Sequence, residues 1–271
     1  MALNDISLTA GMRSNLLQLQ TTSKLIDRTQ ERLSTGKQVN SALDNPTNFF
    51  AAQSHNNRAA DFAIRKDGMS EAIQQVKAAD AGISAITALV QAAKGLASAA
   101  TASAVTTDRA SLATQFASLL TQITQLSSDS GYRGINLTNQ NTLTVLFNED
   151  GAAKLTVTGF DGTSSGLGMI SAFAGWTDVN GAASDSAKLD SAITTLRSKA
   201  KDLSNNLNII TNRQQFTDAM IGTLSTGADN LTLADMNQEG ANMLMLQTRQ
   251  NLGTTALSLS SQAAQSVLRL F

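Results

Sequence analysis

The sequence predicts a mainly α-helical protein. We expect a long antiparallel coiled-coil rod, with the N- and C-terminal helices paired at one end and a small β-hairpin and loop cap at the other. Three observations support this fold class. Apolar residues follow a coiled-coil period in five stretches, 1 Pro in 271 residues lets helices run long, and alternating strand-like residues occur only in the middle of the chain.

The five helical stretches show apolar residues at alternating steps of four and three. This spacing averages 3.5 residues, the period of a left-handed coiled-coil seam. The first row is interrupted by the polar residues Ser23 and Gln30, whereas the fourth continues far enough to span roughly 50 Å at about 1.5 Å per residue. The rows are Met12–Leu33, Met69–Val90, Leu112–Leu126, Leu189–Leu224 and Leu252–Leu270.

The middle of the chain has a different pattern. Thr142–Phe147 and Leu155–Thr158 alternate apolar and polar residues around Asn148–Gly151, which indicates a hairpin with an Asp-Gly turn. Gly159–Ser186 is rich in Gly, Ser and Asp and is expected to form loops. Since this cap turns the chain around, both termini should lie at the same end of the molecule.

These patterns divide the chain into three expected parts. Residues 1–35 and 236–271 form a terminal coiled coil, residues 36–138 and 187–235 form a helical rod, and residues 139–186 form the cap. Nothing globular flanks the terminal helices, and isolated helices of this length are marginal in water. We therefore expect the two ends to become ordered when they pair with each other and with other copies.

The composition argues against several functional classes. The formal net charge is −1 and Lys and Arg are scattered, so no basic stripe indicates nucleic-acid binding. Zero Cys excludes disulfides and thiolate metal sites. We predict no catalytic, metal-binding or cofactor-binding residues: His55 is the only histidine and lacks a partner cluster, and Gly162–Gly168 lacks the Lys-Ser/Thr of a phosphate loop.

The sequence contains neither an expected secretory signal peptide nor an expected membrane-spanning segment. The first 11 residues contain no basic segment followed by an apolar core, so they do not form a secretory signal peptide. The apolar runs are shorter than the roughly 20 residues of a membrane span, and we predict no membrane insertion. A membrane-active amphipathic helix is disfavoured because no basic face accompanies the apolar ones.

Three motifs, in order along the chain, resemble those of bacterial flagellins. Arg32–Pro46 resembles the family signature after the first helix, and Asp129–Leu137 is similar to the segment where the outgoing helix ends. The tail, with Leu252–Leu259 and Ser266–Phe271, is similar to the family's C-terminal pattern. The resemblance covers roughly residues 1–138 and 187–271 and is greatest to the short flagellins of alphaproteobacteria.

This resemblance implies a structural protein and no enzyme. Flagellins are exported unfolded through the flagellar type III channel and polymerise into the extracellular helical filament used for swimming motility. It implies a homopolymer whose terminal helices line the channel, with a flagellar export chaperone, the filament cap and hook-junction proteins as further partners. The alternative is a hook–filament junction protein, which shares related terminal helices and export.

The resemblance and the seam together predict the residues of assembly. The filament-core interface is expected to contain Leu16, Leu19, Ile26, Leu33, Met243, Leu246, Leu252, Leu259, Val267 and Leu270. The segment that resembles the family's spoke, which helps to set protofilament register, includes Ser34, Gly36, Asn40, Asp44 and Pro46.

Many flagellins carry an epitope for the flagellin-sensing Toll-like receptor, built on an Arg, a Leu and a Glu of the outgoing helices. The matching stretch here includes Gln91, and Leu96 fits the pattern. Ala92 falls where the Arg would be and Gln115 where the Glu would be. Because two charges are missing, we predict weak or absent receptor activation.

Overall fold

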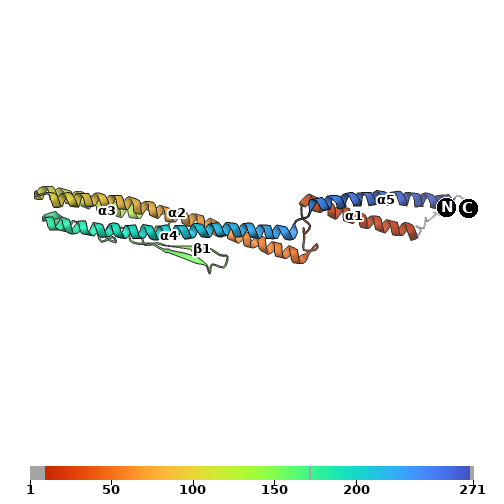
Figure 1. Cartoon of the computed structure of the whole chain (residues 1–271), viewed down its shortest axis with the longest axis horizontal. Coiled ribbons are helices and arrows are strands. Elements are labelled where there is room, and N and C mark those ends of the chain that lie inside the picture. The colour runs from red at the N-terminus through yellow and green to blue at the C-terminus, as the bar shows by residue number, and fades with distance from the viewer. Residues whose placement is uncertain (1–9, 171, 269–271) are drawn as a thin grey trace, which may run out of the picture. The chain divides into compact units, whose positions relative to one another are not determined.

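The computed structural model describes residues 10–170 and 172–268. The chain forms two compact units: unit 1 contains residues 1–57 and 223–271, and unit 2 contains residues 58–222. The elements, coloured along the chain in Figure 1, are α1 (Ala10–Thr35), α2 (Pro46–Ala102), α3 (Thr106–Asp129), β1 (Thr142–Leu146), β2 (Lys154–Thr158), the 3-10 turn η1 (Phe173–Trp176), α4 (Val179–Thr232) and α5 (Met236–Leu268). All five predicted helices and the hairpin are confirmed, and α2 and α4 contribute residues to both units.

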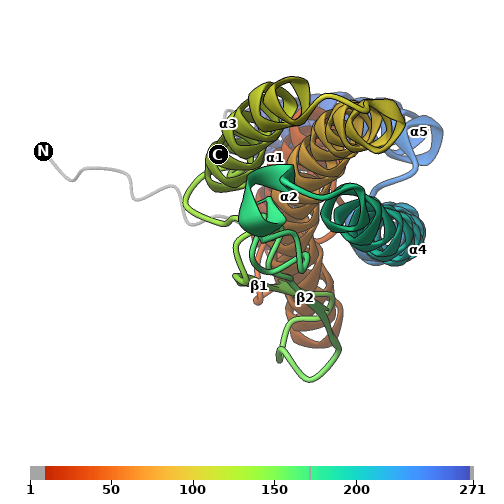
Figure 2. The same ribbon diagram turned by 90° about the vertical axis from the view of Figure 1, so that its left-hand side faces the viewer.

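Unit 2 is a bundle of long helices. Seen along the helices in Figure 2, α3 and α4 lie beside α2, and the β-hairpin covers a further side. The predicted seam residues form the core, and Val90, Phe116, Ile123 and Leu196 are almost fully buried. Alanines of α2 are buried between them, and such small side chains let helices approach closely. The fully buried alanines are Ala79, Ala93, Ala97 and Ala100.

One end of unit 2 is organised around Arg109, where α2 turns into α3. Its guanidinium donates hydrogen bonds to the carbonyl oxygens of Ser103 (2.9 Å), Trp176 (3.2 Å) and Thr177 (2.8 Å). The indole of Trp176 is fully buried, packs on Phe116 and donates to the carboxylate of Asp185 at 2.9 Å. These bonds fasten the loop before α4 onto the turn between α2 and α3.

The middle segment differs from the expected cap in two ways. The hairpin is antiparallel, with Leu143 opposite Val157 facing the core, but it lies along the helices and not at the α2–α3 turn. Its turn residue Glu149 accepts from Arg58 (2.8 Å) and Arg65 (3.2 Å), which lie more than 30 residues before the end of α2. The loop around Trp176, by contrast, lies at the α2–α3 turn, where Arg109 binds the carbonyl oxygens of Trp176 and Thr177.

The second difference is the start of α4. The Gly- and Ser-rich composition predicted loop as far as Ser186, yet the helix begins at Val179. Asp178 precedes it and accepts the backbone N–H of Asn180 at 3.2 Å, as a helix-capping residue does. Asp185 then accepts a bond from the indole of Trp176 and one from Lys188, one turn further along α4, and these bonds compensate for the poor helix propensity of the first turns.

The segment after α3 is held by a buried polar cluster. The Asn136 amide donates to the carbonyl oxygens of Ser127 (2.8 Å) and Ser128 (3.0 Å), which satisfies acceptors left open at the helix end. Thr138 adds a hydroxyl bond to Ser127 at 2.8 Å. The flagellin-like motif Asp129–Leu137 therefore ends α3 and positions the strand that follows.

One helix is longer and more apolar than the sequence analysis allowed. By length and composition alone, α2 contains an 18-residue window that could cross a membrane, with a mean hydropathy of 1.3 and 33% of it buried. The uninterrupted apolar runs are still shorter than a membrane span, and the window reaches this hydropathy because alanines between the seam residues add apolar character. A core helix of a water-soluble protein passes the same test, so this feature is weak evidence for insertion.

Candidate assembly interface

The terminal helices α1 and α5 pack against each other in unit 1. They run antiparallel, so the start of α1 and the end of α5 lie at the same end of this unit (Figure 1). Arg32 faces Glu239, and Leu19 faces Gly253 so closely that a Cβ on the glycine would lie 2.6 Å from Leu19 Cδ2. The two contacts are 13 residues apart on α1 and 14 on α5, which fixes one constant register.

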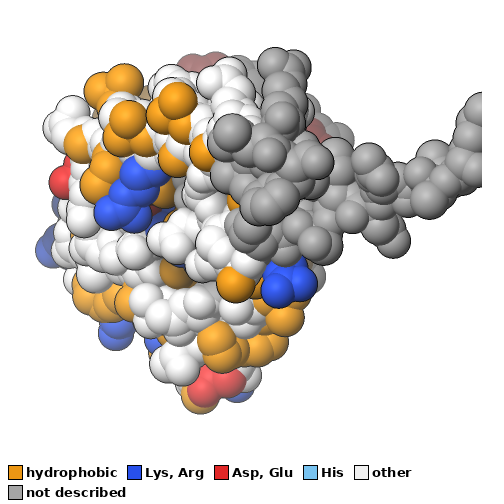
Figure 3. Space-filling view, turned by 90° about the vertical axis from the view of Figure 1, so that its right-hand side faces the viewer, with side chains coloured by type: hydrophobic (Ala, Val, Ile, Leu, Met, Phe, Trp, Pro, Cys, Tyr) orange, Lys and Arg blue, Asp and Glu red, His pale blue; other side chains and the backbone are white. Residues whose placement is uncertain are grey.

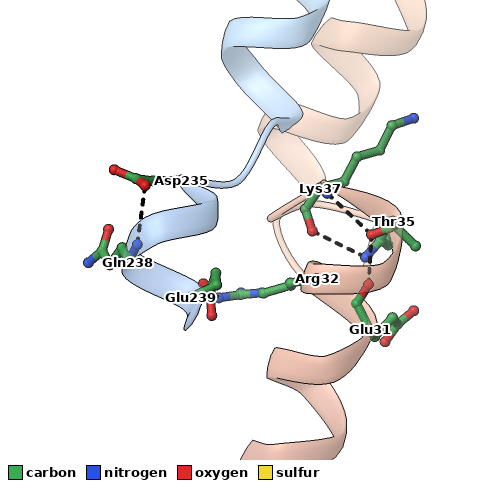
Figure 4. Close-up of polar contacts among 8 residues, drawn as sticks. Glu31, Arg32, Thr35, Lys37, Asp235, Gln238 and Glu239 are labelled. Atoms are coloured by element: carbon green, nitrogen blue, oxygen red, sulfur yellow. Dashed lines mark hydrogen bonds and ion pairs between the residues drawn. The ribbon is translucent and has the colours of Figure 1, made fainter. Parts of the chain in front are cut away.

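Figure 4 shows the joint where α1 ends and α5 begins. Asp235 accepts the backbone N–H groups of Asn237 (2.9 Å) and Gln238 (3.1 Å) and so caps α5. One turn further, Glu239 Oε1 forms an ion pair with Arg32 at 3.0 Å, with side-chain exposures of 9% and 18%. The predicted glycine at the end of α1, Gly36, has φ +69°, the left-handed conformation in which glycine commonly ends a helix.

The predicted spoke segment is an ordered turn between α1 and α2. Asp44 Oδ2 accepts the backbone N–H groups of Asn40 (3.1 Å) and Ser41 (3.0 Å), and the bond from Ser41 lowers the pKa of this carboxyl below its ordinary value. Asn45 accepts the N–H of Asn48 at 3.1 Å, and Pro46 begins α2, as its missing N–H allows.

This turn is tied to the junction between α4 and α5. The backbone N–H of Gln38 donates to Thr232 O at 2.7 Å, and that of Ala234 donates to Gly36 O at 3.0 Å. Ser34, in the last turn of α1, is exposed. The spoke segment therefore connects all four helices of unit 1 through main-chain bonds, while its Leu43 side chain is 96% exposed.

The face of α1 that meets α5 is rotated from the predicted seam. Its buried residues are Met12, Thr22 and Thr29, whereas Leu16 is 39% exposed. The other predicted interface residues of this helix, Leu19, Ile26 and Leu33, are half-buried. The buried threonines Thr22 and Thr29 lie one position before Ser23 and Gln30, the polar residues that interrupt the predicted row.

The helix α5 has two apolar faces. Leu246 is buried and Met243 half-buried on the face toward α1. A second row, one heptad per step, lies beside this buried contact: Met245, Leu252 and Leu259 are 47%, 65% and 62% exposed, and Leu252 borders a groove that α1 lines with Leu19 and Thr22. Hydrophobic side chains are visible on the surface at this end of the chain (Figure 3). Val267 lies in α5, but its side chain and all of Leu270 fall outside the described residues.

The comparisons with known proteins agree with this arrangement. Residues 6–142 match the family model described as the bacterial flagellin N-terminal helical region. Flagellin FljM of Caulobacter vibrioides is 31% identical over 274 residues, covering 100% of both chains. The chain belongs to the bacterial flagellin family. Flagellin FljO of the same organism is also 31% identical over 274 residues, and a Brucella melitensis flagellin is 30% identical over 269 residues, 93% of this chain and 94% of that one.

Membership in this family makes the protein a structural subunit of the bacterial flagellar filament, as the sequence predicted. The described part of this flagellin contains no group of three or more His, Asp or Glu residues arranged to hold a metal ion. His55 is half-buried on α2 beside Gly227, and no titratable cluster surrounds it in the described residues.

The residues that match the receptor epitope of other flagellins lie in unit 2. Gln91 and Ala92 are exposed on α2, and Leu96 is half-buried against the core of the bundle. Gln115 is exposed on α3. The surface positions that would hold the two missing charges are thus open to solvent and occupied by neutral side chains.

Sequence reasoning missed two contacts of the terminal pair. Arg32 and Glu239 were not predicted as partners, and Gly253 was not predicted as the hole for Leu19. A signal was present, because Glu239 falls in the same helical row as Met243 and Leu246. A single acidic residue in an apolar row indicates that a cation lies opposite.

Proposed function

We propose that this flagellin assembles through the outer apolar face of its terminal helices. The observation that carries the proposal is the row Met245, Leu252 and Leu259 on α5, which the described part of the chain leaves about half exposed or more. Burying the exposed part of each side chain in a neighbour would contribute about 1–2 kcal/mol. Since every subunit repeats the row, a homopolymer is the partner that this surface fits.

Within this proposal, three parts of unit 1 have different roles. The faces that α1 and α5 turn toward each other form the subunit's own terminal coiled coil. The outer faces pack against other copies and line the filament channel, together with Leu16 and the predicted positions Val267 and Leu270. The turn around Asp44 fixes the position of α2 relative to the terminal pair within unit 1 and so contributes to protofilament register.

We further propose the route and partners that the family resemblance implies. The chain leaves the cell unfolded through the flagellar type III channel and joins the extracellular filament under its cap. A flagellar export chaperone would cover the apolar face of α5 before export, and hook-junction proteins would contact the first subunits. The role is structural and not enzymatic. A junction protein would be a trace component of sheared filaments, whereas this chain should be their predominant protein.

The test compares two neighbouring aspartates on α5. Leu259→Asp places a charge in the outer apolar row. Burying this unpaired charge against a neighbouring copy would cost about 3–5 kcal/mol per subunit. Ser258→Asp adds the same charge to an exposed position one residue away, outside that row. We expect Leu259→Asp to give soluble monomer and no filament, and Ser258→Asp to give filaments of normal length by electron microscopy.

Both variants should keep the helical content of the parent by circular dichroism, because neither residue is buried in the single chain. Filaments of normal length from Leu259→Asp would refute the assembly role of this face. Loss of filaments from both variants would show that α5 tolerates no added charge and that the apolar row has no special part.

A further inference from the structure

We infer that the ion pair between Arg32 and Glu239 sets the register of α1 against α5, and that it does so at no gain in the stability of the pair. In the described part of the chain it is the only ion pair that joins these two helices. Its consequence for the filament rests on the proposed role of the terminal helices in assembly, while its effect on register can be measured separately.

The geometry of the pair argues against a stabilising role. Arg32 Nη1 and Glu239 Oε1 are 3.0 Å apart, but Arg32 Nε and Glu239 Oε2 are both buried and lack a hydrogen-bond partner (Figure 4). Each group thus loses water on two polar atoms and regains one bond. Buried ion pairs with incomplete hydrogen bonding are often no more stable than apolar side chains of the same volume.

The rest of the seam holds little register information. Thr22 and Thr29 are buried along α1. Between them, Leu25 and Ile26, which are similar in size to each other, are half-buried. A heptad seam of this kind can slide by seven residues and still place apolar or small groups opposite each other. Along the seam itself, the fit of Leu19 against Gly253 distinguishes positions sterically. The main-chain bonds from Gln38 to Thr232 and from Ala234 to Gly36 hold the chain just outside the two helices, and the ion pair acts inside the seam, one turn from those bonds.

If α5 slides against α1 by one heptad in either direction, one charged side chain of the pair loses its partner. In one direction Leu246, which is buried, takes the place of Glu239, and the guanidinium of Arg32 faces an aliphatic side chain. In the other direction Glu239 moves seven residues along α1 and faces Leu25. An unpaired charge in such a seam is strongly unfavourable, so the pair selects the observed register by penalising both alternatives.

The chain contains no Cys, so introduced cysteines report register without background. Leu19 Cγ lies 3.1 Å from the Cβ position that Gly253 would have, which places a cysteine pair at these sites within disulfide reach. L19C/G253C reports the observed register, and L19C/L246C and L19C/S260C report a slide of seven residues in each direction. Intramolecular bonds are separated from bonds between copies by size on a non-reducing gel.

Each reporter is placed in three full-length backgrounds and oxidised with diamide. The parent should give only the L19C/G253C bond. R32M/E239L, which replaces the pair with apolar side chains, should divide its bonds among the three reporters while its thermal midpoint does not fall. R32E/E239R, which reverses both charges, should return to L19C/G253C alone and should assemble like the parent.

The outcomes separate a register role from a merely structural one. R32M/E239L that still gives only L19C/G253C would overturn the inference, as would R32E/E239R that divides its bonds among the reporters. A thermal midpoint that falls in R32M/E239L with the register unchanged would show that the pair acts through stability alone. Failure of the cysteine-free parent to polymerise would count against the proposed function and not against the register role.

Discussion

Replacing Arg109 with methionine tests how the end of unit 2 is held together. Arg109 is 7% exposed and has no carboxylate within bonding distance in the described contacts; its charge is solvated by backbone and hydroxyl oxygens. Methionine fills a similar volume but removes every donor. The carbonyl oxygens of Ser103, Trp176 and Thr177 then lose their partner.

The size of the effect follows from which acceptors can return to water. Thr177 and the hydroxyl of Thr106 are on exposed residues, so their oxygens regain water when the guanidinium is removed. The carbonyl of fully buried Trp176 and that of half-buried Ser103 cannot do so freely. The unsatisfied carbonyl of Trp176 should cost about 1–3 kcal/mol and the half-buried carbonyl of Ser103 about 1 kcal/mol, so unit 2 should lose about 2–4 kcal/mol in total.

The single tryptophan of the chain makes the assay local. Trp176 is buried beside Asp185, so its fluorescence should shift to longer wavelength in Arg109→Met as the η1 segment loosens. The thermal midpoint of unit 2 should fall by roughly 5–15 °C. Arg133→Met is the control, because its 2.9 Å ion pair with Glu71 is 64% exposed on the arginine side and such pairs contribute about 0–1 kcal/mol.

An unchanged tryptophan emission and an unchanged midpoint in Arg109→Met would refute the role assigned to these bonds. Equal losses in Arg109→Met and Arg133→Met would also do so, since they would show that any arginine-to-methionine change in this unit has the same effect. A loss confined to Arg109→Met agrees with the reasoning.

Two further predictions concern the exposed turns and helices. Hydrogen bonding lowers the pKa of Asp44 in the folded chain, so the ionised carboxylate should stabilise the turn above about pH 4, and this stabilisation should disappear as the pH falls through the lowered pKa. Amide exchange at Asn40 and Ser41 should therefore be faster at pH 3 than at pH 6, beyond the change in the intrinsic exchange rate. The acceleration should be smaller in Asp44→Asn. The parent should fail to activate a flagellin-sensing reporter cell at nanomolar concentration, and Ala92→Arg with Gln115→Glu should increase the response; a nanomolar response to the parent would contradict the prediction.

The helices could be predicted well from the sequence because the same periodic spacing of apolar residues forms the core along each of them. Rows such as Leu189–Leu224 repeat at 3.5 residues, and a residue such as Leu196 at their centre is fully buried. The hairpin was predicted for a similar reason, since Leu143 and Val145 alternate with exposed threonines. Local periodicity was sufficient wherever one face of an element meets one neighbour.

Three-dimensional placement was not available from the same pattern. The position of the hairpin depends on bonds from Arg58 and Arg65 to Glu149, residues more than 80 apart in the chain. The start of α4 depends on the contact of Trp176 with Asp185. In both cases the deciding contact involves side chains whose partners a one-dimensional period cannot identify.

The terminal seam shows how a correct period can still point to a different face. Leu16, Leu252 and Leu259 are spaced for a coiled coil, yet in the single chain they remain 39%, 65% and 62% exposed. A helix with apolar residues on two faces gives one merged row when it is read along the sequence. Separating the two faces requires knowing that the partner helix sits against Thr22 and Leu246.

This separation explains why assembly and folding should be coupled at the ends of the chain. Unit 2 buries large side chains such as Phe116, Ile123 and Leu196 almost completely, so it is stable without a partner. Among the described residues, the set buried between α1 and α5 contains two large apolar residues, Met12 and Leu246, with threonines and a half-satisfied ion pair for the remainder. Such a pair gains little free energy by itself. Its larger apolar face is the outer one, and only neighbouring copies can bury it, so the same leucines that leave the single chain incomplete favour the polymer.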